Sequence, residues 1–269
     1  MKKTILITGS TDGIGKEAAA HLASLGHRVW LHGRNASKLD GVLGELRGRF
    51  PDAEIDAVAG DLSTIASVEA LGQEIEERVE SLDVLINNAG VFTTRDPRTS
   101  DGLDIRFAVN TIAPYALAKR LMPRMGASGR TVNLSSAAQS PVDLRALAGE
   151  GQLSDGQAYA QSKLAITMWT RALAKPQESG GPIIVAVNPG SMLGTKMVKD
   201  AYGVAGADVR IGAEILGRAA LDDDFGAASG QYFDNDSGRF ASPHPAALDA
   251  AKCDDVVRAI EAVLEKRGV

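Results

Sequence analysis

The feature that most constrains the fold is a regular alternation of two kinds of segment along the 269 residues. Short apolar runs rich in β-branched residues, typical of buried strands, lie at 4–8, 28–31, 54–58, 83–86, 131–134, 183–187 and 231–233. Segments with helical spacing lie between them, at 14–25, 37–49, 64–79, 102–122 and 155–175, and again from about 250. Strands alternating with helices in this way predict an α/β fold with one doubly wound parallel sheet, covered by helices on both faces.

Two stretches fall outside this alternation. Residues 141–156 lack a clear core element, and residues 194–208 are rich in Gly and Ala and contain two short possible helices. Both follow strands, and loops at the carboxyl ends of parallel strands are where sites are built. We therefore expect a single domain over residues 1–269, with these stretches as excursions from one sheet rather than linkers.

Composition excludes several classes of function. A single cysteine, Cys253, rules out an internal disulfide and a Cys-based metal site, and the four histidines lack metal-ligand spacing. The net charge of −5 without a basic block, and only 4% aromatic residues, argue against nucleic-acid binding. The apolar stretch after Lys2 and Lys3 is too short for a signal segment or a membrane span. The sequence thus predicts no metal, no nucleic-acid partner, no membrane span and a cytoplasmic location.

A glycine-rich turn joins the first strand to the first helix. Glycines stand at positions 9, 13 and 15, and the residues expected to bind a dinucleotide here are Gly9, Ser10, Thr11, Asp12, Gly13, Ile14 and Gly15. Such a turn lets phosphate approach the backbone, and the helix N-terminus supplies N–H donors. A tight turn without a ligand is the alternative. The strand before and the helix after the turn favour nucleotide binding.

The end of the second strand carries Arg34 and Asn35 where a carboxylate would accept bonds from the adenosine ribose hydroxyls. A guanidinium instead suits a ribose 2′-phosphate by charge and geometry. A solvated loop arginine is the alternative, but the position after the dinucleotide turn favours NADP over NAD. Asp12 is an opposing charge, unless it caps the first helix or points to solvent.

The ends of the third and fourth strands add further candidates. Asp61 is placed to accept a bond from the adenine amino group, with Leu62 against the ring, or else Asp61 and Ser63 cap the helix at Thr64. The fourth strand runs into Asn88, Ala89 and Gly90, which suit a ribose or a closely approaching cofactor. A simple turn is the alternative reading of this last segment.

Tyr159 and Lys163 stand four residues apart and therefore on one helix face. A lysine ammonium near a phenol lowers the tyrosine pKa from its usual value of about 10. Such a tyrosine can pass a proton to or from a carbonyl or alcohol oxygen. Ser135 and Ser136 end the fifth strand, where a hydroxyl could bind the same substrate oxygen. Each of these signals alone also occurs by chance.

Taken together, these segments resemble the short-chain dehydrogenase/reductase family. The matching residues occur in the family order over residues 4–190, and they are Thr8, Gly9, Gly13, Gly15, Asn87, Asn88, Ala89, Gly90, Asn110, Ser135, Ser136, Tyr159, Lys163, Asn188, Pro189 and Gly190. The resemblance implies a Rossmann-type sheet of about seven parallel strands, a nicotinamide cofactor and hydride transfer. It implies Tyr159 as general acid/base and Lys163 as the residue that lowers its pKa and holds the nicotinamide ribose. It further implies that Ser136, the second serine of the pair, orients the substrate oxygen, and that Asn110 anchors a water linking Lys163 to a proton relay.

The gap between Ser136 and Tyr159, 23 residues, is longer than in many family members. The additional residues fall in 141–156, and an insert here is similar to the retinol-dehydrogenase-like branch, which usually uses NADP. Residues 230–233 also resemble that branch. The family further implies a homodimer or homotetramer formed through the helices at 102–122 and 155–175.

The segment after the sixth strand resembles the family's nicotinamide-side loop. The residues expected to contact the cofactor there are Pro189, Gly190, Met192 and Thr195, with Thr195 on the carboxamide. Residues at about 194–210 would then form a lid, whose apolar side chains suggest a hydrophobic carbonyl or alcohol substrate. Ordinary helix packing is an equal alternative for any one of these side chains.

The function expected is therefore an NADP(H)-dependent oxidoreductase that acts on a small-molecule carbonyl or alcohol, with Tyr159 as general acid/base. Two other classes remain open. One is a non-catalytic dinucleotide-sensing or scaffold protein on the same fold, which the presence of Ser136, Tyr159, Lys163 and Asn110 disfavours. The other is a different enzyme on this fold, such as an epimerase, a dehydratase or an enoyl reductase.

Overall fold

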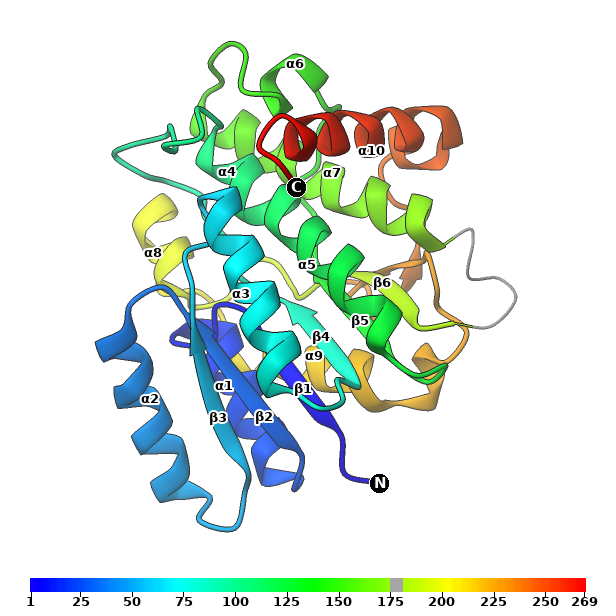
Figure 1. Cartoon of the computed structure of the whole chain (residues 1–269). Coiled ribbons are helices and arrows are strands. Elements are labelled where there is room, and N and C mark those ends of the chain that lie inside the picture. The colour runs from blue at the N-terminus through cyan, green and yellow to red at the C-terminus, as the bar shows by residue number, and fades with distance from the viewer. Residues whose placement is uncertain (175–180) are drawn as a thin grey trace.

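The computed structural model describes residues 1–174 and 181–269 (Figure 1). Its strands form one sheet in the order β3-β2-β1-β4-β5-β6-β7-β8. The strand bounds are β1 Thr4–Ile7, β2 Arg28–Gly33, β3 Ile55–Ala59, β4 Val84–Asn87, β5 Arg130–Leu134, β6 Ile183–Asn188, β7 Tyr232–Asp234 and β8 Arg239–Ala241. Strands β1 to β7 pair in parallel and β8 pairs antiparallel with β7. The strand order reverses between β1 and β4, where ligands bind in open α/β sheets.

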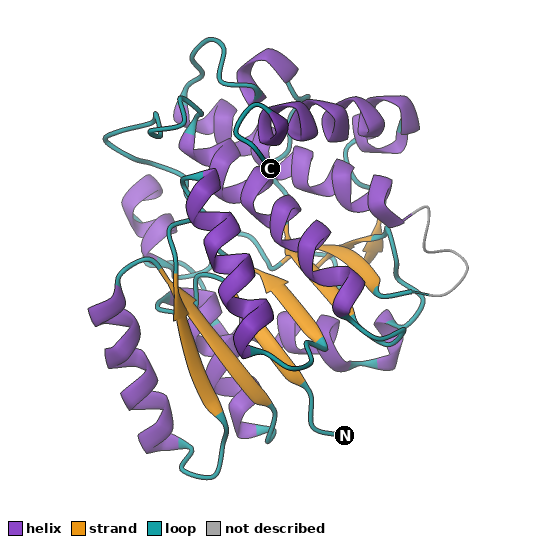
Figure 2. Ribbon diagram, in the orientation of Figure 1, coloured by secondary structure: helices purple, strands orange, loops and turns teal. Residues whose placement is uncertain are grey.

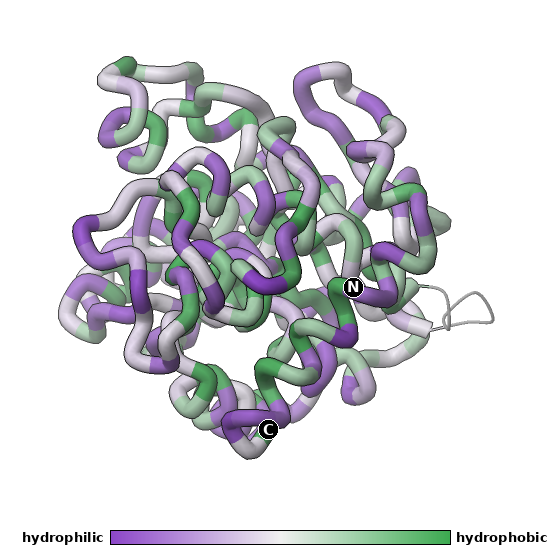
Figure 3. The backbone as a smooth tube through the Cα atoms, turned by 90° about the horizontal axis from the view of Figure 1, so that it is seen from above, coloured by the Kyte–Doolittle hydropathy of each residue, from purple (hydrophilic) through white to green (hydrophobic). Residues whose placement is uncertain are grey.

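Helices cover both faces of the sheet (Figures 1 and 2). Their bounds are α1 Gly13–Ser24, α2 Ala36–Arg49, α3 Ile65–Arg78, α4 Ile105–Phe107, α5 Ala113–Leu121, α6 Leu144–Leu147, α7 Asp155–Ala174, α8 Lys196–Tyr202, α9 Arg210–Leu221 and α10 Ala250–Glu265. Helices α3, α5 and α7 pack on one face with α10 outside them, and α1, α2 and α9 pack on the other. Hydrophilic and apolar stretches alternate along the outer helices, as expected of amphipathic helices on a buried sheet (Figure 3).

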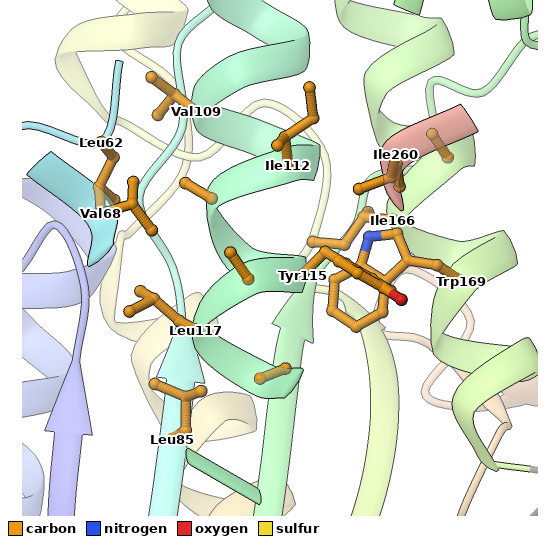
Figure 4. Packing of buried hydrophobic residues seen from close by; sticks show 14 of the residues in the cluster. Leu62, Val68, Leu85, Val109, Ile112, Tyr115, Leu117, Ile166, Trp169 and Ile260 are labelled. Carbon is orange, nitrogen blue, oxygen red and sulfur yellow. The ribbon is translucent and has the colours of Figure 1, made fainter. Parts of the chain in front are cut away.

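Two hydrophobic cores follow from the alternation of side chains along each strand. In β1, Ile5 and Ile7 belong to the core under α1 and α9, whereas Leu6 belongs to the opposite core. In that second core, Tyr115 of α5 and Trp169 of α7 meet edge to face with ring centroids 5.6 Å apart (Figure 4). Burial on both faces explains why the strands read as continuous apolar runs rather than as alternating ones.

The sequence-based fold is confirmed, and all seven expected strands lie within two residues of their predicted bounds. The short strand β8 was not expected, because Arg239–Ala241 is only three residues long. Lys175, the expected last residue of the helix at 155–175, lies outside the described residues. Across residues 1–174 and 181–269, no helix combines the length and the hydropathy needed to cross a membrane.

The predicted continuous helix at 102–122 is wrong in detail. It divides into α4, a π-helical turn at Ala108–Ile112 and α5. Pro114 lies in the first turn of α5 and has no N–H to donate, which favours an interruption of the α-helical ladder just before it. Of the two short helices expected within 194–208, only α8 forms, and the stretch at 141–156 contains the single turn α6.

Candidate active site

A cavity of about 660 Å³ runs along the carboxyl ends of the parallel strands. Most of the expected site residues line it, namely Gly9, Thr11, Asp12, Gly13, Ile14, Gly15, Arg34, Asp61, Leu62, Asn88, Ala89, Gly90, Ser136, Tyr159, Lys163, Pro189, Gly190, Met192 and Thr195. Three expected residues, Ser10, Asn35 and Asn110, do not line it. The cavity therefore joins the glycine turn to the tyrosine and lysine of α7.

The glycine turn is held by the segment after β4. Gly9 has φ +66°, and a Cβ there would lie 2.8 Å from the Cα of Ala89. A Cβ on Gly15 would lie 2.3 Å from Nδ2 of Asn88, which donates to the carbonyls of Thr8 and Gly9 at 2.9 and 3.0 Å. Glycine is thus required at both positions by close approach.

The first turn of α1 leaves donors free for a ligand. Among the described residues, no acceptor receives the amide N–H of Ile14 or Gly15, and both residues line the cavity. Unpaired amides at a helix N-terminus favour an anion. The turn therefore has the form of a phosphate cradle.

His32, which the sequence analysis did not single out, fastens this turn to the end of β3. Its Nδ1 accepts from the Gly9 amide at 3.2 Å, so the neutral ring donates from Nε2 to the Gly60 carbonyl at 3.1 Å. The side chain is buried, and burial lowers the pKa of His32 to about 4. A lone histidine in a strand gives no signal of this role in the sequence.

Ser10 and Asn35 have structural partners instead of facing the cavity. The Ser10 hydroxyl is buried and accepts from the His32 amide at 2.8 Å, and the Ser10 amide donates to the His32 carbonyl at 2.9 Å. Asn35 caps α2, because its Oδ1 accepts from the Lys38 amide at 2.8 Å. Neither residue lines the cavity, and these atoms have partners within the fold, so their binding to a cofactor stays a prediction.

Arg34 and Asp12 both line the cavity. Arg34 is exposed and has no ion-pair partner in the part of the chain that the structure describes. Asp12 caps α1 through the Gly13 amide at 2.8 Å, and its second oxygen accepts from Lys38 Nζ at 2.8 Å. The Lys38 ammonium lowers the pKa of Asp12. Asp12 is therefore the helix cap rather than a free opposing charge, and Arg34 is available for an anion.

Asp61 does not cap the helix that follows it. Its Oδ1 accepts from the Ser63 amide at 2.9 Å, whereas the first amide of α3, that of Ile65, donates to Asp101 at 2.7 Å. The cap comes from a residue 36 positions away, which the sequence pattern did not reveal. Leu62 is buried beside Val68 and contributes to the core in Figure 4 as well as to the cavity.

Tyr159 lies beside Ser136 and has a raised pKa. Burial raises the pKa of Tyr159 to about 12, although a hydrogen bond with the Ser136 side chain lowers it in part. Lys163 is buried, and burial lowers its pKa to about 8. Its Nζ donates to the Leu134 carbonyl at 2.7 Å and lies 5.7 Å from the centre of the Tyr159 ring. Burial of the phenol therefore dominates the pKa of Tyr159 in this structure, and the expectation that Lys163 lowers that pKa stays a prediction.

The two serines after β5 have different surroundings. Ser135 is buried, and its hydroxyl lies 2.7 Å from Thr167 Oγ1 and 3.0 Å from the Lys163 carbonyl. Ser136 is half-buried beside Tyr159, and its carbonyl accepts from the Tyr232 hydroxyl at 3.2 Å. This geometry supports the choice of Ser136 over Ser135.

Asn110 lies in the π-helical turn and is fully buried. Its side chain exchanges two hydrogen bonds with the Val91 backbone, at 2.8 and 2.9 Å, and donates to Ser162 Oγ at 3.0 Å. A Cβ on Gly90 would lie 3.6 Å from Asn110 Oδ1 and 3.7 Å from Lys163 Nζ. Asn110 thus fixes the loop after β4 close to the lysine.

The loop after β6 is fixed by the turn between β7 and β8, which sequence analysis missed. The Asp236 carboxylate accepts from the Ser191 amide at 2.7 Å, the Ser191 hydroxyl at 2.6 Å and Asn188 Nδ2 at 2.9 Å. Burial alone would raise the pKa of Asp236, but the hydrogen bonds from Ser191 and Asn188 lower it. Met192 in this loop has φ +53°, a left-handed conformation uncommon outside glycine.

Comparisons with known proteins agree with this geometry. A sequence profile described as short chain dehydrogenase matches residues 3–203. Retinol dehydrogenase 12 of Mus musculus is 32% identical over 244 residues, covering 86% of this chain and 77% of that protein. A solved protein from Mycobacterium Paratuberculosis has the same fold, with a TM-score of 0.80, 24% identity, and coverage of 98% of this chain and 93% of that one. A metagenomic short-chain oxidoreductase in complex with NADP is 28% identical, with a TM-score of 0.63, and covers 81% of this chain and 90% of that one.

Proposed function

The chain belongs to the short-chain dehydrogenase family, and from that premise we propose that it is an NADP(H)-dependent oxidoreductase that transfers a hydride between the nicotinamide and a hydrophobic carbonyl or alcohol. Tyr159, Lys163 and Ser136 meet in a cavity whose other end is the glycine turn, and this convergence carries the proposal. A sensor or scaffold protein would need the glycine turn to bind a dinucleotide, but it would not need Ser136 and Lys163 beside Tyr159.

The residues of the cavity fit a dinucleotide with an additional phosphate. The amides of Ile14 and Gly15, which have no acceptor among the described residues, suit the pyrophosphate, and the exposed guanidinium of Arg34 suits the 2′-phosphate. The other proposed contacts are Asp61 and Leu62 for adenine, Asn88, Ala89, Gly90 and Lys163 for the riboses, and Pro189, Gly190, Met192 and Thr195 for the nicotinamide side. When bound, this cofactor supplies or accepts the hydride. The metagenomic relative solved with NADP supports the choice of cofactor.

The proton is assigned to Tyr159. With a pKa of about 12, the phenol is protonated at neutral pH and can donate to the carbonyl oxygen during reduction. The Ser136 hydroxyl lies beside the phenol and is placed to orient the same oxygen. Lys163, with a pKa of about 8, stays mostly charged at pH 7 and can stabilise the phenolate once the proton has left. Asn110 holds the loop next to this lysine.

Residues 194–210 form the proposed lid within a single domain over 1–269. The Gly194 amide donates to the Ala207 carbonyl at 2.6 Å, and the Ala207 amide donates to the Met192 carbonyl at 2.8 Å. These bonds close the two ends of the segment on each other, and α8 projects between them without a fully buried residue. The cytoplasmic location and the homodimer or homotetramer stay predictions.

Replacement of Tyr159 by Phe tests the chemistry. Tyr159→Phe removes the transferable proton and keeps the ring, so turnover should fall by about 10²- to 10⁴-fold in an assay of NADPH oxidation with a panel of carbonyls. NADPH affinity, measured by titration, should change little because the phenol is not placed against the phosphates.

Near-normal turnover in the variant would reject Tyr159 as the acid. Binding of NADPH by the wild type without turnover of any carbonyl would favour the sensor, and conversion of a substrate without net NADPH oxidation would favour an epimerase or dehydratase.

A further inference from the structure

Three aromatic side chains form a row that begins at the proposed acid. Phe92, in the loop after β4, meets Tyr159 nearly edge to face, with ring centroids 4.6 Å apart and planes at 79°. Tyr202, the last residue of α8, stacks on Phe92 with centroids 5.9 Å apart and planes at 18°. All three rings line the cavity. The row thus extends from the reacting centre to the lid.

The outer part of this row is open to solvent. Tyr202 is 57% exposed and Phe92 is half-buried. Within residues 1–174 and 181–269, no hydrogen bond or ion pair joins a side chain of α8 to another element. Its contacts with the body are apolar, through Tyr202 and through Met197, whose Cε would lie 3.7 Å from a Cβ on Gly90. Phe92 and Tyr202 therefore form an apolar surface at the mouth of the cavity, which no other described element covers.

The charges on the same helix do not favour a charged ligand. Lys196 and Asp200 both line the cavity with opposite signs, and the charge of Lys196 also acts on Asp12. The aromatic rings therefore dominate the recognition of whatever group lies between the reacting carbon and the mouth of the cavity.

We propose that Phe92 and Tyr202 are specificity-determining residues, which favour substrates with an aromatic or planar conjugated group attached to the reacting carbonyl or carbinol carbon. A planar π-system can pack offset or edge-on against these rings and gains more than the burial of its area, whereas a flexible aliphatic chain gains the burial alone. The proposal rests on the oxidoreductase function proposed above and deepens it.

Two aldehydes of different shape test this preference with NADPH as reductant. Cinnamaldehyde is planar and conjugated, and hexanal is flexible and aliphatic. Phe92→Leu and Tyr202→Leu keep an apolar side chain and remove the ring, so each should lower kcat/KM for cinnamaldehyde by about three- to tenfold and change that for hexanal by less than about twofold. Tyr202→Phe restores the ring and should restore the preference. Ile211→Ala, on the exposed face of α9 and outside the cavity, serves as the control.

The outcomes distinguish the aromatic preference from the oxidoreductase function on which it rests. Equal losses for the two aldehydes, or no loss in either leucine variant, overturn the aromatic preference while the oxidoreductase function stands. A wild type that reduces no carbonyl with NADPH overturns both. Because Tyr202 is exposed, Tyr202→Leu decides the question even if Phe92→Leu does not fold.

Discussion

Acidification from pH 7 to pH 5 should destabilise the protein through His32. The buried ring accepts a hydrogen bond from Gly9 and donates one to Gly60, an arrangement that needs the neutral imidazole. Burial holds the pKa of His32 at about 4, whereas a histidine ordinarily has a pKa of about 6.5. Between these two values the unfolded chain binds a proton that the folded chain does not, so the free energy of unfolding falls as the pH drops from about 6.5 toward 4. The difference between pH 7 and pH 5 amounts to about 2 kcal/mol for this one residue.

Urea denaturation at the two pH values measures this effect. Trp30 and Trp169 are both buried, so their fluorescence reports unfolding. Other groups also titrate in this range, and the matched variant His32→Gln removes only the imidazole while it keeps an amide donor and acceptor. The wild type should lose about 2 kcal/mol more than the variant between pH 7 and pH 5.

The same loss of stability in both proteins would refute the reasoning, because it would mean that His32 is as easily protonated in the folded state as in the unfolded one. Direct titration of the His32 ring by NMR gives an independent check, since its resonances should not shift between pH 7 and pH 5.

Two further substitutions test the ends of the cofactor site. Arg34→Ala should weaken NADPH binding by about ten- to a hundredfold and leave NADH almost unchanged, because only NADPH carries the 2′-phosphate. Titration of both cofactors decides this, and equal losses would show that Arg34 is only a surface residue. Asp236→Ala should raise the KM for NADPH by about tenfold, since the Ser191 loop loses a charge-assisted anchor. Ser237→Ala is its control, because Ser237 lies in the same turn and its hydroxyl bonds, among the described residues, to Asp234. An unchanged KM in Asp236→Ala would exclude the anchoring role.

The parts of the fold set by local chemistry were predictable from the sequence. Parallel strands that are buried on both faces need continuous apolar residues, so a run such as 183–187 is recognisable as a strand from the sequence. The glycine turn was predictable too, because close approach and positive φ leave few alternatives to glycine at position 9. The short strand β8 and the break before Pro114 depend on neighbouring elements, and a pattern read along one segment does not contain them.

The side-chain partners at the site were less predictable. Ser10 and Asn35 have the residue types that a cofactor site uses, but the fold turns them to His32 and Lys38. His32 and Asp236 act on residues that are 23 to 48 positions away, so no local motif marks them. The pKa of Tyr159 depends on burial and on contacts with Ser136 and Tyr202, which come from other segments and which the spacing on one helix does not show.

The turn between β7 and β8 sets a minimum length for an active fragment. The family profile ends at residue 203, and a truncated protein designed on that match would keep Ser136, Tyr159 and Lys163. It would lose the Tyr232 hydroxyl bonded to the carbonyl of Ser136 and the Asp236 carboxylate bonded to Ser191. Chimaeras that exchange residues 194–210 should therefore carry residues 232–236 as well, because these residues bond to Ser136 and Ser191.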